Sequence, residues 1–167
     1  MKKLFSVLLL GVLVIGASST VLADTDTFDA TGEVVASIEV DTVEDLDFGN
    51  FAAGTGGEVI IDADTGDRSV TGEVTLAGGD HQRAEFAVAG AAEQSYVFTF
   101  PGDAQTLSGP GGANMSLSLS IDADGTDREL NGGDDTVYLG GTLTVNDEQN
   151  VGQYSTDTPI EVSVAYD

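Results

Sequence analysis

The amino-acid sequence predicts an all-β protein with an immunoglobulin-like, pilin-like β-sandwich fold. Apolar and polar residues alternate along most of the chain, and no segment repeats its apolar residues at helical spacing. Glycine-rich turns separate the alternating runs in this chain of 167 residues with 22 glycines. Alternation turns one face of a strand toward a core, and several short strands joined by such turns are typical of a β-sandwich.

The first 23 residues have the order of a secretory signal peptide. Lys2 and Lys3 supply a positive start, residues 4–16 form an apolar run, and Ala23 ends a stretch of small residues. The apolar run is shorter than the roughly 20 residues that a membrane-spanning helix needs. We therefore expect a secreted protein that passes through the periplasm to the cell surface or the exterior, with no membrane span after signal cleavage.

Eight later segments carry strand patterning, and turn-forming residues lie between them. Seven alternate with period two, at residues 28–40, 70–76, 86–88, 96–100, 115–121, 137–145 and 160–166. The eighth, residues 59–61, is a short apolar run that we expect to be covered on both faces. The main turns are expected at residues 54–57, 78–80, 101–103, 109–112 and 131–134, where glycine permits a positive φ. The inward face of the C-terminal strand is predicted to carry Ile160, Val162, Val164 and Tyr166.

The first alternating run is too long for one strand of a small sandwich. Thirteen residues at about 3.3 Å each would extend about 43 Å. We therefore divide it into a first domain strand at residues 36–40, within a sandwich domain of residues 36–167, and an N-terminal extension of residues 24–35. The extension is a candidate donor strand for a neighbouring subunit. Its apolar side is formed by Phe28, Ala30, Gly32 and Val34. The alternative is that the extension folds back as an edge strand of its own domain.

The charge balance excludes several classes of function. The chain has 29 Asp and Glu residues against five Lys and Arg, a formal net charge of −24, and both lysines lie in the predicted signal peptide. A protein that binds nucleic acid through its phosphates needs basic side chains, so we expect no nucleic-acid partner. Three arginines cannot pair with 29 acids, and most carboxylates must be solvated and mutually repulsive. The absence of cysteine excludes disulfides and thiolate metal sites.

An internal echo recurs at an offset of 60 residues. Residues 61–68 and 121–128 both begin Ile-Asp-Ala-Asp and end Asp-Arg. We interpret them as two hairpin turns in which aspartates bond the local backbone. The alternative is a calcium site, because Ca²⁺ prefers several carboxylate and carbonyl oxygens. The carboxylates concerned are Asp62, Asp64, Asp122 and Asp124. We assign neither a metal site nor a cofactor.

The sequence offers little material for catalysis. His81 is the one histidine, it lies in a polar loop, and no serine stands in a Gly-x-Ser-x-Gly nucleophile elbow. There is no tryptophan to stack on a sugar. We therefore predict that the protein is not an enzyme and assign no catalytic residue.

The two ends of the chain after the signal peptide resemble a known family. Residues 30–40, followed by Asp-Leu-Asp-Phe-Gly-Asn-Phe at 45–51, look like the opening of spore coat protein U-like domains, which are similar to archaic chaperone–usher pilins. Residues 151–155 and 160–167 look like the final hairpin of those domains. The chain also resembles an uncharacterised cysteine-free group of bacterial secreted β-sandwich domains, through Leu-Asp-Phe-Gly and the Leu-Gly-Gly-Thr-Leu run at 139–143. Pilins of the archaic group usually carry a cysteine in the strand that matches residues 36–40, and this chain has none.

The resemblance implies an incomplete sandwich and assembly by donor-strand exchange. A periplasmic chaperone and an outer-membrane usher would be transient partners, and copies of this chain or related subunits would be the final ones. We therefore expect a structural subunit of a bacterial surface fibre or coat, such as a fimbrium or pilus used in cell adhesion. The alternative function is a monomeric secreted or periplasmic module that binds calcium or a glycan.

Overall fold

The computed structural model describes residues 24–167; the predicted signal peptide, residues 1–23, lies outside the described residues. The chain divides into two units, Met1–Glu33 and Val34–Asp167. In the described part of the first unit, residues 24–33, no strand or helix forms and every residue is exposed. The second unit is built from β-strands, which confirms the predicted all-β sandwich class. No helix within residues 24–167 is long and apolar enough to span a membrane.

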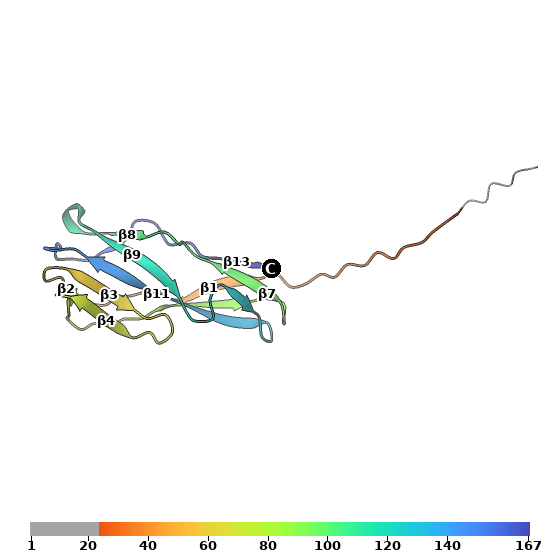
Figure 1. Cartoon of the computed structure of the whole chain (residues 1–167), viewed down its shortest axis with the longest axis horizontal. Helices are drawn as coiled ribbons and strands as arrows, with labels where there is room; N and C mark the ends of the chain where they lie inside the picture. Colours follow the sequence, from red (N-terminus) through yellow and green to blue (C-terminus); the bar gives the residue numbers. More distant parts are fainter. Residues whose placement is uncertain (1–23) are drawn as a thin grey trace, which may run out of the picture. The chain divides into compact units, whose positions relative to one another are not determined.

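The larger sheet of the second unit is antiparallel and contains eight strands. Its main path is β1 (Glu39–Glu44), β6 (Ala84–Ala89), β11 (Asp134–Val145), β9 (Asn114–Ile121), β8 (Gln105–Ser108) and β12 (Ser155–Thr156). Two further strands join at β11, namely β3 (Gly57–Ile61) and, beyond it, β4 (Arg68–Gly72). Figure 1 shows β4, β3, β11, β9 and β8 crossing the sheet in that order.

The central strand β11 changes its neighbour at a glycine. Along one edge, its first half pairs with β6 as far as Leu139, and its second half pairs with β3 from Gly141. Gly140 lies at the change, where a Cβ would collide with the carbonyl oxygen of Ile61 and lie 2.7 Å from the amide nitrogen of Ala63. Glycine therefore allows two strands to approach the same edge of β11 from opposite ends.

A smaller sheet covers only one half of the larger one. It consists of β10 (Asp127–Glu129), β7 (Ser95–Thr99) and β13 (Ser163–Tyr166), in that order. The strands β2 (Phe51–Ala52) and β5 (Thr75–Leu76) form a separate pair, and η1 (Pro110–Gly112) is a single 3₁₀ turn. The core correspondingly has two buried clusters. One is built around Phe86, Tyr96, Phe98 and Leu139. The other is built around Phe48, Val59, Leu117 and Leu143.

Several predicted strands differ from the observed ones at their ends. The first strand is Glu39–Glu44 rather than residues 36–40, because the ladder with β6 begins at the pair Glu39 and Ala89. The predicted strand at residues 70–76 is divided after Gly72, whose φ of +64° turns the chain away from β3. In the apolar run at 59–61, Val59 and Ile61 are buried and Ile60 is half-buried.

The C-terminal strand is also shorter than predicted. It begins at Ser163, which pairs with Thr99, so Ile160 and Val162 precede it. The next residues along β7 lead to Pro101, which has no backbone N–H for a longer ladder. The alternation of burial is nevertheless as predicted over the whole run. Its half-buried members are Ile160, Val162, Val164 and Tyr166.

Candidate functional site

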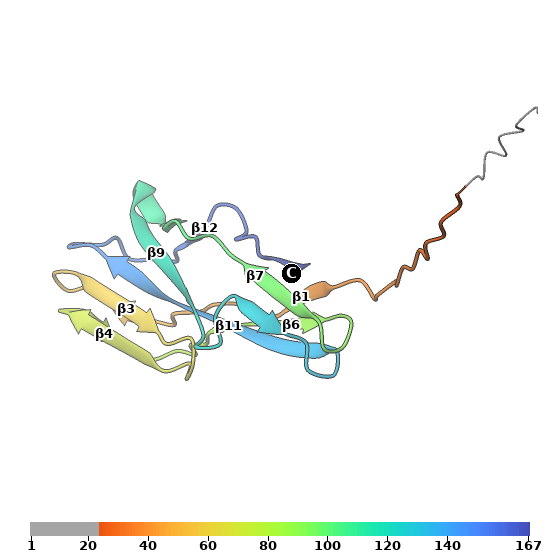
Figure 2. The same ribbon diagram turned by 45° about the vertical axis from the view of Figure 1, so that its right-hand side comes forward.

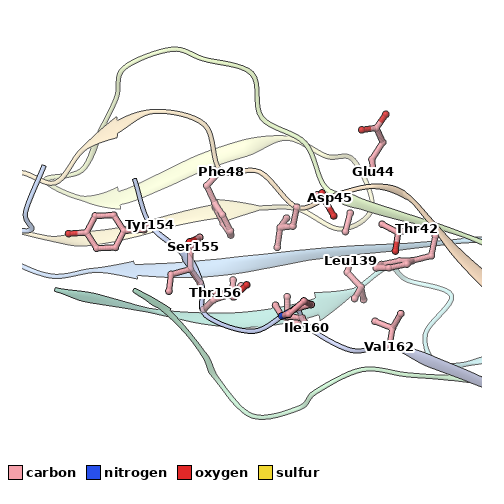
Figure 3. Close-up of a pocket in the computed structure, with 17 residues that line it drawn as sticks. Thr42, Glu44, Asp45, Phe48, Leu139, Tyr154, Ser155, Thr156, Ile160 and Val162 are labelled. Atoms are coloured by element: carbon pink, nitrogen blue, oxygen red, sulfur yellow. The ribbon is translucent and has the colours of Figure 1, made fainter. Parts of the chain in front are cut away.

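An apolar groove lies against the inner face of the larger sheet. The groove has a volume of about 540 Å³ and separates two stretches of chain, residues 42–48 and residues 154–162. Figure 3 shows Phe48 and Ile160 among the side chains that line it from these two stretches. A second hollow of about 960 Å³ continues it beyond Phe48 and Tyr154, which line both.

The floor of the groove is the inner face of the larger sheet. It is formed by aliphatic and aromatic side chains from β6, β8, β9 and β11, including Phe86, Leu107, Leu117, Leu119 and Leu139. Phe86, Leu117 and Leu139 are buried, and Leu107 and Leu119 are half-buried, so the floor belongs to the core and is only partly open to the groove.

Both walls of the groove carry backbone that lacks a partner strand. β1 pairs with β6 along one edge, and within residues 24–167 no strand pairs with its other edge. Residues 157–162 belong to no strand, and none of the turn and loop backbone hydrogen bonds found in residues 24–167 involves them. Unpaired strand edges of this kind are templates for adding a strand.

A tyrosine links the start of the domain to its last strand. The Tyr166 hydroxyl donates a hydrogen bond to the Ala36 carbonyl oxygen at 2.9 Å and accepts one from the Ala91 N–H at 2.6 Å. These bonds hold the start of the domain against the end of β13, and Figure 2 shows the C-terminus beside β1.

The predicted site residues fall into two groups. Ile160 and Val162 line the groove, whereas Val164 and Tyr166 lie in β13 beside it. The predicted donor residues lie outside it: Phe28 is 91% exposed, Val34 is 99% exposed, and Ala30 and Gly32 are exposed as well. The sequence did not identify the wall at residues 42–48 or the floor, because alternation does not say which buried face lacks a cover.

The second Asp-Arg echo forms a buried ionic network rather than a hairpin turn. β9 leads into β10 of the other sheet, and the Arg128 side chain is only 4% exposed. Its guanidinium contacts Asp122 at 2.7 Å and Asp135 at 2.7 Å, and the Tyr96 hydroxyl donates to Asp135 at 2.7 Å. Arg128 also donates to the Thr136 carbonyl oxygen. This network joins the two sheets.

Burial disfavours the charged forms of Arg128 and Asp135, and hydrogen bonding within the network outweighs this effect for both. The bonds to Asp135 and Asp122 raise the pKa of Arg128 despite desolvation. The bonds from Arg128, Tyr96 and the Thr136 N–H lower the pKa of Asp135. Burial, followed by the bond to Asp135, raises the pKa of the Tyr96 hydroxyl. At neutral pH the network therefore holds an ionised Asp135, a charged Arg128 and a neutral Tyr96.

The first echo is a hairpin turn, as predicted. β3 pairs with β4, and Asp62 accepts hydrogen bonds from the backbone N–H groups of Asp64 and Thr65, which lower its pKa. The Asp64 carboxylate accepts a bond from the Ala123 N–H at 2.6 Å, so the two echo turns touch. Residues 24–167 contain no group of three or more His, Asp or Glu side chains placed to hold a metal ion.

All three arginines outside the predicted signal peptide are held by internal contacts. Arg68 donates to the Phe48 carbonyl oxygen at 2.8 Å. Arg83 bonds the carbonyl oxygens of Ala63 and Asp64 and lies 3.4 Å above the centre of the Tyr138 ring. Arg128 belongs to the buried network. Each arginine of residues 24–167 therefore makes polar contacts within the fold.

Comparison with known proteins finds a family but no named relative. No curated protein matches, and no solved structure matches. A family model does match, over residues 38–166, which is nearly all of the sandwich. The chain therefore belongs to the family described as a domain of unknown function, DUF4402.

Proposed function

We propose that this protein is a structural subunit of a bacterial surface fibre or coat, assembled by β-strand addition. The apolar groove would accept residues 24–35 of a second copy, here called the donor segment, and each subunit would complete the sandwich of the next. The observation that carries the proposal is the occurrence, in one chain, of an apolar groove whose two walls lack a partner strand and of an exposed extension of alternating apolar residues.

The dimensions of groove and donor segment agree. The apolar side of the donor segment runs from Phe28 to Val34, seven residues or about 23 Å of extended chain. The wall at residues 42–48 has the same number of residues. An inserted strand would place its alternate side chains on the floor and its backbone between two unpaired edges. Main-chain hydrogen bonds would supply affinity, and the apolar side chains would supply register.

Several features favour a second copy over the chain's own extension. Self-insertion beside β1 would require a reversal within residues 34–38, whose sequence is Val-Val-Ala-Ser-Ile. This stretch has no glycine, proline, asparagine or aspartate, and its β-branched residues disfavour a tight turn. Tyr166 also holds the backbone at Ala36. A donor that leaves one subunit and enters another makes a head-to-tail contact, which can continue into a filament.

Export supports the same proposal. A chain with a signal peptide would cross the periplasm with its groove uncovered, so a periplasmic chaperone and an usher are the partners we propose for transit. Negative-stain images of material secreted by the native cell should then show fibres.

A truncation of the mature chain tests the proposal. Residues 24–167 should self-associate with rising concentration in sedimentation velocity, whereas residues 36–167 should stay monomeric. The proposal fails if residues 24–167 are monomeric under every condition in which the shorter chain folds.

A peptide test separates donor binding from general stickiness. A peptide of residues 26–35 added to the 36–167 chain should raise its melting temperature, because a ligand that binds only the folded state stabilises it. The control peptide exchanges Phe28 with Asp29 and Glu33 with Val34, which keeps composition and breaks the alternation. Equal stabilisation by both peptides would contradict strand insertion in register.

A further inference from the structure

We infer that strand insertion in this protein is gated by ionic strength, because the donor segment and the rim of the groove carry charge of the same sign with no cation placed to offset it. This inference rests on the proposed function and adds its regulation. Subunits would remain separate in dilute medium and assemble where salt screens the repulsion.

The donor segment is purely anionic. Its side chains include four carboxylates, Asp24, Asp26, Asp29 and Glu33, and no base. When its alternate residues Phe28 to Val34 face the floor, Asp29 and Glu33 have the opposite parity and face outward. Both would then stand above the groove, close to its two walls.

The walls carry the same sign. Glu44 and Asp45 line the groove, and Figure 3 shows them on the same wall as Thr42. Asp157 and Glu161 are exposed on the opposite wall. Insertion would therefore bring the outward carboxylates of the donor between two acidic rims.

No side-chain cation in residues 24–167 is available to relieve this repulsion. Arg128 is buried in its network, and Arg83 is bound to the carbonyl oxygens of Ala63 and Asp64. Arg68 is bonded to the carbonyl oxygen of Phe48, which lines the groove. The one remaining source of screening is the solvent. The Debye length falls from about 30 Å at 0.01 M salt to about 3 Å at 1 M, so salt removes most of the repulsion between neighbouring rims.

The experiment measures association of the mature chain, residues 24–167, by sedimentation velocity in sodium chloride from about 0.01 M to about 1 M. We expect the apparent dissociation constant to fall at least about tenfold over this range.

The double variant Asp29→Asn with Glu33→Gln should associate in dilute salt nearly as tightly as the unaltered chain does in concentrated salt. The matched control, Asp127→Asn with Glu129→Gln, removes the same two charges on β10, which β7 separates from β13. It should keep the salt dependence of the unaltered chain.

The outcomes distinguish the inference from the function on which it rests. Association that requires the donor segment but does not change with salt would overturn gating and leave strand insertion standing. Equal relief by the control variant would also overturn it, because the effect would then come from net charge alone. Assembly with calcium chloride but not with sodium chloride of matched ionic strength would replace screening by a specific cation site. Absence of association at any salt concentration would overturn both proposals.

Discussion

The Tyr166 hydroxyl donates to the Ala36 carbonyl oxygen across 2.9 Å and so joins the last strand of the domain to the residues that precede its first strand. The same hydroxyl accepts from the Ala91 N–H. One side chain thus links β13 to the residues before β1 and to the loop after β6. The place where the extension leaves the domain is defined by this contact.

Replacing Tyr166 by phenylalanine should destabilise the domain by about 0.5–1.5 kcal/mol, because the Ala36 carbonyl and the Ala91 N–H lose their shared partner. Urea unfolding of the 36–167 chain measures the change. Tyr138→Phe is the control, since its hydroxyl makes no hydrogen bond with any residue in 24–167, and it should alter the free energy of unfolding by less than about 0.5 kcal/mol. Equal losses of unfolding free energy in the two variants would show that the Tyr166 hydroxyl does not link these segments.

Replacing Arg128 by methionine should cost about 3–5 kcal/mol, because Asp122, which is only 7% exposed, would be left as an unpaired buried charge. The control is Asp124→Asn, which removes an exposed carboxylate 3.7 Å from the same guanidinium and should cost less than about 1 kcal/mol. Thermal or urea unfolding measures both. A small loss for Arg128→Met would show that the network does not hold the two sheets together.

The buried Tyr96 predicts a loss of stability in alkali. A group whose pKa is raised by folding stabilises the native state below its ordinary pKa, which for tyrosine is about 10, and this contribution declines as the pH rises above that value. The free energy of unfolding of the unaltered protein should therefore exceed that of Tyr96→Phe by a constant amount between about pH 7 and pH 9, and the difference should shrink above about pH 10. A difference that stays constant to higher pH would contradict the raised pKa.

Replacing Gly140 by alanine should destabilise the protein by about 1–3 kcal/mol, since the new Cβ would collide with the backbone of Ile61 and Ala63 where β11 changes neighbours. Gly102→Ala is the matched control, because a Cβ there meets no atom within 4 Å and the backbone has no positive φ. That variant should be neutral or slightly stabilising. Similar melting temperatures for the two variants would refute the crowding at Gly140.

Mutual repulsion among the carboxylates predicts that the domain itself is stabilised by salt. The melting temperature of the 36–167 chain, which lacks the donor segment and cannot associate through it, should rise from about 0.01 M to about 1 M sodium chloride. Sodium sulfate at matched ionic strength separates screening from the additional effect of an excluded salt on apolar burial. A melting temperature that does not change with sodium chloride would contradict self-repulsion.

Alternation along the chain determined the fold class and which residues of each strand face inward. The inward residues of the C-terminal run, Ile160 to Tyr166, are the half-buried ones, and the exposed apolar residues Phe28 and Val34 lie where the sequence places an extension. These properties are local, because the side-chain period of a strand is decided within a few residues. Strand ends were predicted less well, since they depend on a partner: β1 starts where Ala89 can pair with Glu39, and β13 starts where β7 nears Pro101.

Only the tertiary structure decided where the groove lies. The wall at residues 42–48, the floor around Leu117 and the tie between Tyr166 and Ala36 come from segments far apart in the sequence. The same holds for Arg128, which the sequence placed in a turn and which instead forms ion pairs with Asp122 and Asp135 between two sheets. Alternation in the sequence predicts which side chains avoid water. Which segment covers them depends on the pairing of strands that lie far apart in the sequence.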